Sequence, residues 1–253
     1  MDRLRRHLQL LYQAIEDPSV GNTAQLKDFI TMTFPSSGWS ALEFLPARHL
    51  PKAPLELLLQ GFETDLAFLE GNFPIKDEAA LENYATAVAS TIGVLCLHLV
   101  FHHCAPVPPP DVQRRLVAAG ATMGQALQYI NMARDVAVDA DLGRVYLPTT
   151  WLDEHGLSPE EVLEVPGGPR IEVMRRDLLQ RAFRWYDETR GVMRLIPRPA
   201  RAPMMVAVES YMEIGRVLRE GTKGARRVPI GGRAATVPRS RRIWVAWRTM
   251  AGC

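Results

Sequence analysis

The stretch QYINMARDVAVDADLGRVYLP, which runs from Gln128 to Pro148, combines apolar residues at helical spacing with a row of polar ones. Gln128, Asn131, Asp135 and Asp139 follow one another at intervals of three, four and four residues. That spacing places the four side chains along one face of a helix. A helix needs no such row in order to fold, so this polar row predicts that the face has a further use.

The two carboxylates of the polar row repel each other, at a cost of roughly 0.2–0.5 kcal/mol on an isolated helix. A divalent cation between them removes the repulsion. Mg²⁺ suits the pair because it prefers oxygen ligands and commonly bridges a carboxylate to a substrate phosphate. Arg134 and Arg144 flank the row, and their guanidinium groups could neutralise a diphosphate.

An exposed acidic face with local arginine pairing is the alternative interpretation of the polar row. Glu78 and Glu82 show the same four-residue spacing, as do Glu160 and Glu164, and each pair is best explained as part of a helix start. Spacing alone therefore does not decide between a metal site and an exposed acidic face. Gly120 and Gly124 continue the row toward the N-terminus, and their small size suggests room for a large ligand above it.

Helical periodicity dominates the rest of the 253-residue chain, and no alternating strand pattern or internal repeat is present. The class is all-α, with one domain over residues 1–253. The stretch Tyr84–Phe101 carries no charge over eighteen residues; a buried central helix is favoured over a membrane span because its first half is rich in Ala, Ser and Thr. The main helices are expected at Thr23–Phe34, Pro54–Phe68, Asp111–Asp139, Arg170–Leu195 and Met204–Arg219.

Composition excludes several classes of protein. Three cysteines are too few for a disulfide framework,. No acidic residue occurs from Gly221 to Cys253, where eight Lys and Arg residues are found. This basic end predicts attraction to phosphate on a lipid surface or a ligand, with a merely solvated tail as the alternative. Nucleic acid is not expected, because no recognition motif accompanies the charge. The aromatic residues, Trp244 and Trp247 among them, could line an apolar pocket, but most are interpreted as core.

The segment GQALQYINMARDVAVDADLGRVYLP resembles the second aspartate-rich region of the squalene/phytoene synthase family. It couples Q-x-x-N, R-D-x-x-x-D and G-R-x-Y-L-P in fixed order. Similarity extends to GFETDLAF, to ENYATAVASTIGVLCLHLVF and to PRPARAPMMVAVESYMEIGRVL. The resemblance is greatest to the phytoene synthase part of the fungal bifunctional lycopene cyclase/phytoene synthases, and it covers nearly the whole chain.

The resemblance implies an isoprenoid synthase-type helical bundle around a central apolar cavity. It implies head-to-head condensation of two geranylgeranyl diphosphates to phytoene, through prephytoene diphosphate. Asp135 and Asp139 would be the catalytic, metal-binding carboxylates for Mg²⁺, with Mn²⁺ as a possible substitute. Gln128, Asn131, Arg134 and Arg144 would contact the substrate diphosphate. An intracellular protein attached peripherally to an internal membrane is expected, because the product is a lipid and the end of the chain is basic.

Two departures from the family pattern stand out. Ser90 replaces the glycine usual in V-A-G. No acidic pair of D-x-x-x-D type, the family's first aspartate-rich motif, occurs before Glu78, so the chain is expected to lack the family's N-terminal helices. This leaves open a catalytically inactive relative that acts as an assembly or interaction protein. A squalene synthase-like enzyme is a further alternative, because cavity depth sets the chain length of the substrate.

Overall fold

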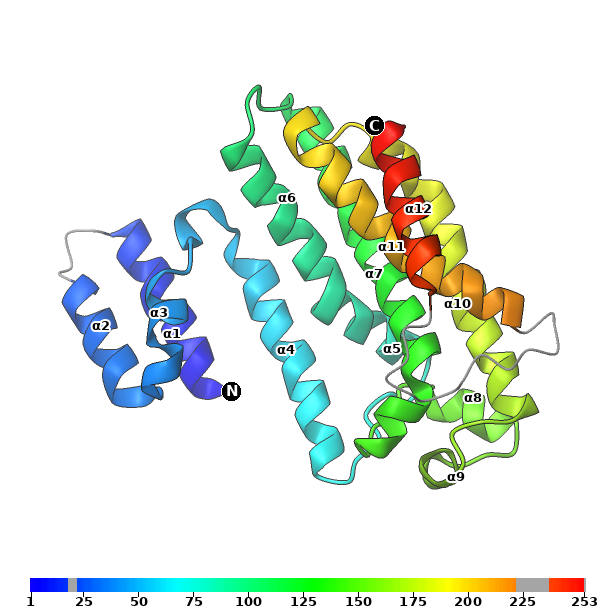
Figure 1. The fold of residues 1–253 in the computed structure, drawn as a ribbon. Helices are drawn as coiled ribbons and strands as arrows, with labels where there is room; N and C mark the ends of the chain where they lie inside the picture. Colours follow the sequence, from blue (N-terminus) through cyan, green and yellow to red (C-terminus); the bar gives the residue numbers. More distant parts are fainter. Residues whose placement is uncertain (18–21, 222–236, 253) are drawn as a thin grey trace.

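The computed structural model describes residues 1–17, 22–221 and 237–252, and all of their regular secondary structure is helical (Figure 1). The all-α class predicted from periodicity is therefore confirmed. The helices, in chain order, are α1 (Asp2–Glu16), α2 (Asn22–Thr33), α3 (Ser36–Glu43), the 3₁₀-helix η2 (Ala47–His49), α4 (Lys52–Leu69), α5 (Glu78–Ala85), the π-helix η3 (Thr86–Ser90), α6 (Thr91–His103), α7 (Pro110–Asp141), α8 (Thr149–Glu154), α9 (Pro159–Glu164), α10 (Pro169–Met193), α11 (Arg198–Gly221) and α12 (Arg239–Ala251).

Helix α7 is the centre of the bundle, 32 residues long and in contact with α5, α6, α10 and α11 (Figure 1). Its side chains at Leu116, Ala126, Ile130 and Ala133 are completely buried. A helix that is buried on several sides stabilises the fold through the apolar surface that it removes from water, at about 25 cal/mol per Å². Every residue of the polar row lies on this helix.

The approach of α6 and η3 to α7 is close enough to exclude side chains at three glycines. A Cβ atom added to Gly124 would lie 2.4 Å from the carbonyl oxygen of Ala89, and one added to Gly93 would lie 2.4 Å from that of Gly120. The space beside Gly120 and Gly124 is thus filled by protein. The interpretation that these glycines leave room for a ligand is wrong, because sequence spacing does not show which helix packs there.

Ser90, the departure from the family pattern, belongs to the same contact. Its side chain is buried, and its hydroxyl donates a hydrogen bond of 2.7 Å to the carbonyl oxygen of Ala121 on α7. A buried hydroxyl without a partner would destabilise the fold by about 1–3 kcal/mol. The carbonyl of Ala121 removes this penalty, so the serine is accommodated where the helices meet.

The segment Glu78–His103, which includes α5, η3 and α6, is the one described helical stretch long and apolar enough to cross a membrane by length and composition. In its most apolar window 44% of the residues are buried, and α6 packs against both α4 and α7. This packing agrees with the central helix predicted for Tyr84–Phe101.

Helices α1 to α3 form a separate layer against α4 (Figure 1). Leu8, Leu11 and Tyr12 pack with Ala47 and Leu59 in a hydrophobic cluster distinct from the one around α7. The Tyr12 hydroxyl donates a hydrogen bond of 2.7 Å to the carbonyl of Leu50. The single domain over residues 1–253 stays a prediction.

Several helix ends differ from the predicted ones. A helix is expected from Asp111, but α7 begins at Pro110, whose missing N–H needs no partner there,. Helix α11 begins at Arg198 and continues through Pro203, so it loses one backbone hydrogen bond inside the helix. The short helices α8 and α9 are not among the main helices expected from the sequence, and a capping box between Ser158 and Glu161 starts α9,.

Replacement of Gly124 by alanine should destabilise the protein, because the new methyl group has only backbone to displace. We expect a loss of about 1–3 kcal/mol in the free energy of unfolding, measured by urea denaturation. Gly191→Ala is the matched control, since nothing lies within 4 Å of a Cβ at that helical position; it should stabilise by about 0.5–1 kcal/mol. Equal effects of the two substitutions would contradict the packing described for α7.

Candidate functional site

The polar row lies along the second half of α7, and each of its side chains is partly buried. The amide nitrogen of Asn131 lies 3.4 Å from the side-chain oxygen of Gln128, so neighbouring members of the row make contact. Asp135 and Asp139 stand one turn further along the same face. The geometry predicted from the spacing is present, whereas the roles assigned to these residues stay predictions.

A tight turn brings Arg144 back toward Asp139 after α7 ends. The N–H of Arg144 donates to the carbonyl of Asp139 at 2.8 Å, and Gly143 in the turn has a φ of 72°. A positive φ of this size favours glycine, and the bond across five residues is the helix stop of a Schellman motif. The Gly-Arg pair of the motif therefore places a cation beside the last carboxylate of the row.

Three further polar side chains, Asp65, Tyr84 and Tyr146, adjoin the row and were missed by the sequence analysis. The hydroxyls of Tyr84 and Tyr146 both donate to Oδ1 of Asp65, at 2.9 Å and 2.8 Å, and the two rings stack with centroids 5.0 Å apart. Asp65 comes from α4, Tyr84 from α5 and Tyr146 from the segment after α7. The site thus receives a single carboxylate from an earlier helix.

One signal in the sequence could have pointed to Asp65. Gly61 and Phe68 are buried on α4, and Asp65 falls between them at intervals of four and three residues. A carboxylate on the buried face of an apolar helix requires partners. The two tyrosines that supply them lie 19 and 81 residues away, so only the fold could identify them.

The pKa of Asp139 is raised to about 7, first by burial and then by the neighbouring charge of Asp135. Arg144 and Arg134 oppose this shift, while the carboxylate of Asp65 adds to it. Burial likewise raises the pKa of Tyr84 and Tyr146, the latter to about 12. The tyrosines are therefore neutral hydrogen-bond donors at neutral pH, and the negative charge of the site is concentrated on the aspartates.

Arg134 binds the first aspartate of the row. Its Nε donates to Oδ1 of Asp135 at 2.6 Å, and its Nη2 donates to Oδ2. Hydrogen bonding to Asp135 raises the pKa of Arg134, and a hydrogen bond with Tyr211 on α11 contributes to the same shift. Local arginine pairing, the alternative interpretation of the row, is thus observed at Asp135. A cation bound there would share this carboxylate with Arg134 or displace it.

The donor set of the site fits a divalent cation and a phosphate together. Oδ1 of Asn131 and Nε of Arg144 are buried and have no hydrogen-bond partner among the residues that the structure describes, which leaves one acceptor and one donor for a ligand. Within the described parts of the chain, no three His, Cys, Asp or Glu side chains lie close enough to hold a metal alone. Mg²⁺ needs no such group, because it is usually bound by one or two carboxylates, waters and substrate phosphates.

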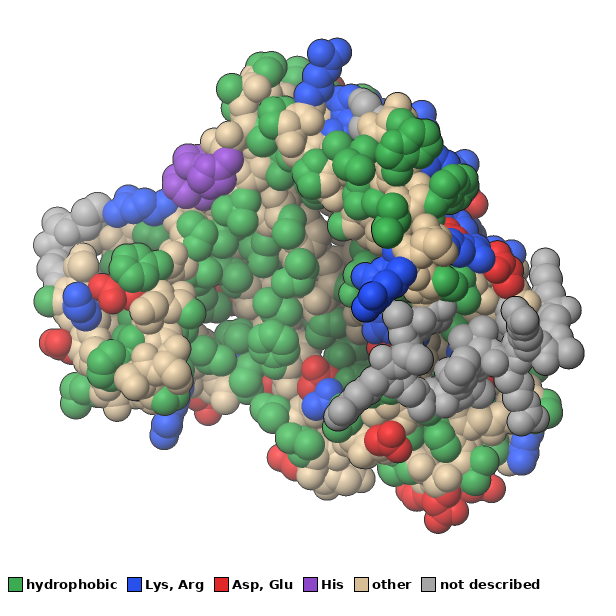
Figure 2. All heavy atoms as spheres, in the orientation of Figure 1, with side chains coloured by type: hydrophobic (Ala, Val, Ile, Leu, Met, Phe, Trp, Pro, Cys, Tyr) green, Lys and Arg blue, Asp and Glu red, His purple; other side chains and the backbone are tan. Residues whose placement is uncertain are grey.

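Hydrophobic side chains cover the middle of one face of the molecule, over α4 and α6 (Figure 2). Phe62 and Leu66 on α4 and Ile92 on α6 are each more than 40% exposed. Asp65, the polar partner of the site, lies on the same helix as Phe62 and Leu66. A polar cluster next to exposed apolar surface suits a ligand with a charged head and a hydrocarbon tail.

The helical arrangement defines the class of the fold. A dehydrosqualene synthase crystal structure superposes with a TM-score of 0.68 at 21% sequence identity, and covers 100% of this chain and 88% of that one. The squalene synthase HpnC from Alicyclobacillus acidocaldarius gives a TM-score of 0.59 at 19% identity, over 87% of this chain and 85% of that one. The chain therefore has the isoprenoid synthase-type helical fold predicted for it.

The sequence comparison names the family. Residues 1–234 match the family model described as squalene/phytoene synthase, and the chain belongs to the squalene/phytoene synthase family. Members of this family act on prenyl diphosphates and depend on a divalent metal.

Several fungal proteins that share one name, bifunctional lycopene cyclase/phytoene synthase, are similar to this chain. The bifunctional lycopene cyclase/phytoene synthase of Colletotrichum graminicola is 50% identical over 250 residues, which is 99% of this chain and 42% of the relative. Those of Gibberella fujikuroi and Neurospora crassa are 46% and 45% identical over 99% and 98% of this chain. The chain spans 42% and 43% of the length of these two relatives.

Asp139 should make the stability of the metal-free protein depend on pH. The pKa of Asp139 is about 7 in the folded state, against 3.8 for an unperturbed aspartate. The native state therefore holds a proton that the unfolded state releases between these values. Stability due to this group therefore falls as pH rises from about 4 to 7. Asp139→Asn should leave stability near pH 4 unchanged and raise it relative to the parent above pH 7, as measured by thermal unfolding with a chelator present.

Asp141→Asn provides the control for this titration, because Asp141 is exposed at the end of the same helix. It should leave the dependence of stability on pH as it is in the parent. An Asp139→Asn variant with the pH slope of the parent would show that Asp139 is not held in a destabilising environment.

Proposed function

We propose that this chain catalyses the head-to-head condensation of two geranylgeranyl diphosphates to phytoene, through prephytoene diphosphate, in carotenoid biosynthesis. The observation that carries the proposal is the polar row on α7 with Arg144 folded back beside it, in a chain of the squalene/phytoene synthase family. The names of the fungal relatives support phytoene as the product. The chain spans only 42% of the length of those relatives. Their names therefore do not establish the activity of this chain, and phytoene synthesis is a proposal for it.

The residues of the polar row have distinct tasks in the proposed reaction. The buried Nε of Arg144 has no partner in the described part of the chain and would donate to a diphosphate oxygen, while Arg134 would add a second guanidinium. Gln128 and Asn131 would orient the bound diphosphate through their amides. Charge separation at the departing diphosphate is the main barrier, so fixed donors aimed at it are the effective contribution of the protein.

The carboxylates would hold the metal. Asp135 and Asp139 are the proposed ligands of Mg²⁺, with Mn²⁺ as the substitute, and the ion when bound would supply positive charge to the leaving diphosphate. The repulsion between Asp135 and Asp139 helps to raise the pKa of Asp139. A bound cation would relieve this repulsion, which favours metal binding. Asp65 is held by Tyr84 and Tyr146 and would keep the two hydroxyls in place next to the metal-binding end of the row.

The prenyl chains require apolar surface, and we propose that the exposed side chains of Phe62, Leu66 and Ile92 would provide it. Burial of such chains removes about 25 cal/mol per Å² of apolar surface from water. The two other functions considered from the sequence are weaker. The relatives share the phytoene synthase name, which favours neither an inactive assembly protein nor a squalene-forming enzyme.

The activity is tested by incubation of the chain with geranylgeranyl diphosphate and Mg²⁺, followed by chromatography of the hydrocarbons. We expect phytoene as the product, and farnesyl diphosphate as a poor substrate. Asp135→Asn should reduce turnover by about 10²–10³-fold, because it removes charge from the metal–diphosphate assembly. Asp141→Asn, exposed on the same helix, should retain it. Full turnover by the Asp135→Asn variant would exclude the proposed role of the row.

Binding can be measured separately from turnover. Mg²⁺ and inorganic diphosphate together should raise the melting temperature of the chain, because ligands that bind only the folded state stabilise it by about 2.7 kcal/mol at one hundred times their dissociation constant. Either ligand alone should have less effect, and Asp135→Asn or Asp139→Asn should abolish the joint effect. A chain that the pair does not stabilise would favour the non-enzymatic alternative.

A further inference from the structure

Helix α12 presents an exposed apolar stripe that the proposed reaction does not use. Ile243, Trp247 and Met250, at intervals of four and three residues, are 71%, 64% and 54% exposed, and the adjacent Trp244 is 52% exposed. Val245 on the opposite side is completely buried, so α12 is packed on one face only. Trp244 and Trp247 are exceptions to the expectation that most aromatic residues belong to the core, because both lie on the outer part of this helix.

The charged residues of α12 are all basic. Arg239 and Arg242 are exposed at its start, and Arg248 stacks over the Trp244 ring with its guanidinium carbon 4.4 Å from the ring centroid. No acidic residue occurs anywhere from residue 221 to residue 253. The part of this basic end that covers Lys223, Arg226, Arg227 and Arg233 lies outside the described residues. An amphipathic helix with tryptophan on one side and arginine beside it has the composition of an interfacial membrane helix.

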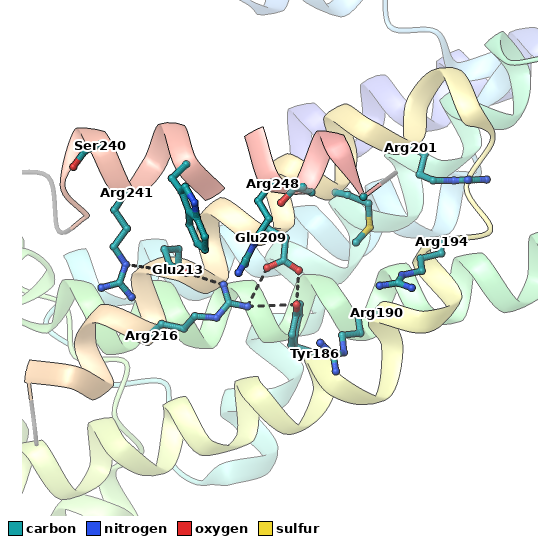
Figure 3. A pocket seen from close by; sticks show the side chains of 14 residues that line it. Tyr186, Arg190, Arg194, Arg201, Glu209, Glu213, Arg216, Ser240, Arg241 and Arg248 are labelled. Atoms are coloured by element: carbon teal, nitrogen blue, oxygen red, sulfur yellow. Dashed lines mark hydrogen bonds and ion pairs between the residues drawn. The ribbon is translucent and has the colours of Figure 1, made fainter. Parts of the chain in front are cut away.

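A cavity of about 1090 Å³ lies between α10, α11 and α12 and shares Trp244 and Arg248 with this helix (Figure 3). Its carboxylates are already neutralised. Arg216 donates to Glu209 at 3.0 Å and to Glu213 at 2.8 Å, the Tyr186 hydroxyl donates to Glu209, and Arg241 donates to Glu213. Glu209 and Glu213 therefore have their hydrogen-bond and ion-pair partners without the other arginines that line the cavity.

The positive charge left over belongs to Arg194, Arg201 and Arg248, which line the cavity and form no ion pair with a carboxylate of the described chain. Arg201 donates its Nε to the carbonyl of Ile196 at 3.0 Å, which leaves its terminal nitrogens for another acceptor. Arg194 and Arg201 lie toward one end of the cavity, apart from the Glu209–Arg216–Glu213 group (Figure 3). Guanidinium groups without carboxylate partners are suited to phosphate.

We propose that α12 docks onto an anionic phospholipid bilayer, with Ile243, Trp244, Trp247 and Met250 at the level of the acyl chains and the cavity around Arg194, Arg201 and Arg248 receiving a lipid phosphate. The bilayer is the occupant that explains both features at once. A free phosphate would use the arginines but leave the apolar stripe in water, whereas a protein partner for the stripe would have no need of the cavity.

The ion pairs on the inner side of α12 fix its position for this role. Arg241 binds Glu213 and donates two hydrogen bonds of 2.7 Å to Glu220, and both glutamates belong to α11. Glu213 is only 4% exposed. The helix is therefore held firmly against α11 through its buried face while its apolar stripe faces outward.

The test is co-sedimentation of the full chain with vesicles of phosphatidylcholine alone and of phosphatidylcholine with phosphatidylserine. We expect binding to the anionic vesicles at least about tenfold stronger than to the neutral ones, and weaker binding as salt increases. Trp247→Ser should reduce it by about tenfold through loss of inserted surface. Arg194→Glu should reduce binding to the anionic vesicles by at least about fivefold, because one arginine near an anionic membrane surface contributes about that factor to the affinity.

Two matched substitutions control for general effects. Met32→Ser removes an 87% exposed apolar side chain on α2, and Arg184→Glu reverses an exposed charge on α10 away from the cavity. Both should bind vesicles within about twofold of the parent, and all four variants should melt like the parent. Asp135→Asn should also bind like the parent, so failure here is distinguishable from failure of the proposed reaction.

Three results would overturn the proposal. Binding that is equal for neutral and anionic vesicles, or unchanged in Trp247→Ser and Arg194→Glu, would exclude this surface. Competition by millimolar glycerol 3-phosphate with no effect of Trp247→Ser would assign the cavity to a soluble phosphate. Dimers in sedimentation velocity that disappear in Trp247→Ser, without vesicle binding by the parent, would assign the stripe to a second copy of the chain.

Discussion

The backbone contact between α7 and the η3–α6 segment determines the geometry of everything that the chain places on α7. The absence of side chains at Gly93, Gly120 and Gly124 lets carbonyl groups approach where a methyl group would not fit, and Ser90 adds a hydrogen bond across the same contact. Because protein interiors are close-packed and do not deform continuously, this contact fixes the rotation of α7. The rotation of α7 decides which way the polar row faces.

The site that results is unfavourable without a ligand. Asp135, Asp139 and Asp65 concentrate negative charge where burial and mutual repulsion raise the pKa of Asp139. Within the described ranges of the chain, an acceptor on Asn131 and a donor on Arg144 lack partners. Unfavourable electrostatics of this kind are found at functional sites, where a bound ligand relieves them. A cation with a diphosphate would satisfy both signs of charge at once, and this makes the arrangement more suitable for a metal–diphosphate pair than for either ion alone.

The sequence predicted what depends on local spacing and failed where distant segments meet. The polar row lies within one helix, so helical periodicity was sufficient to place its side chains on one face. Arg144 was expected only to flank the row, and the turn at Gly143 that returns it toward Asp139 is a result of the structure. Asp65, Tyr84 and Tyr146 come from three separate segments and could not be connected before the fold was known. The glycines of α7 were misinterpreted for the same reason, since the helix that fills the space beside them is remote in sequence. Trp244 and Trp247 depart from the expectation of mostly buried aromatic residues, because hydrophobicity alone does not show which face of a helix lacks a partner.

Helix α11 stands between the two phosphate-binding regions proposed for this chain. On one side Tyr211 contributes to the raised pKa of Arg134 beside the polar row, and on the other Glu209, Glu213 and Arg216 face the cavity and α12. A reaction that consumes amphiphilic diphosphates and releases a hydrocarbon benefits from proximity to a bilayer, since the product has little affinity for water. With α12 on the membrane, the ion pairs of Glu213 and Glu220 with Arg241 would hold the polar row at a fixed distance from the lipid surface, separated from it by the width of α11.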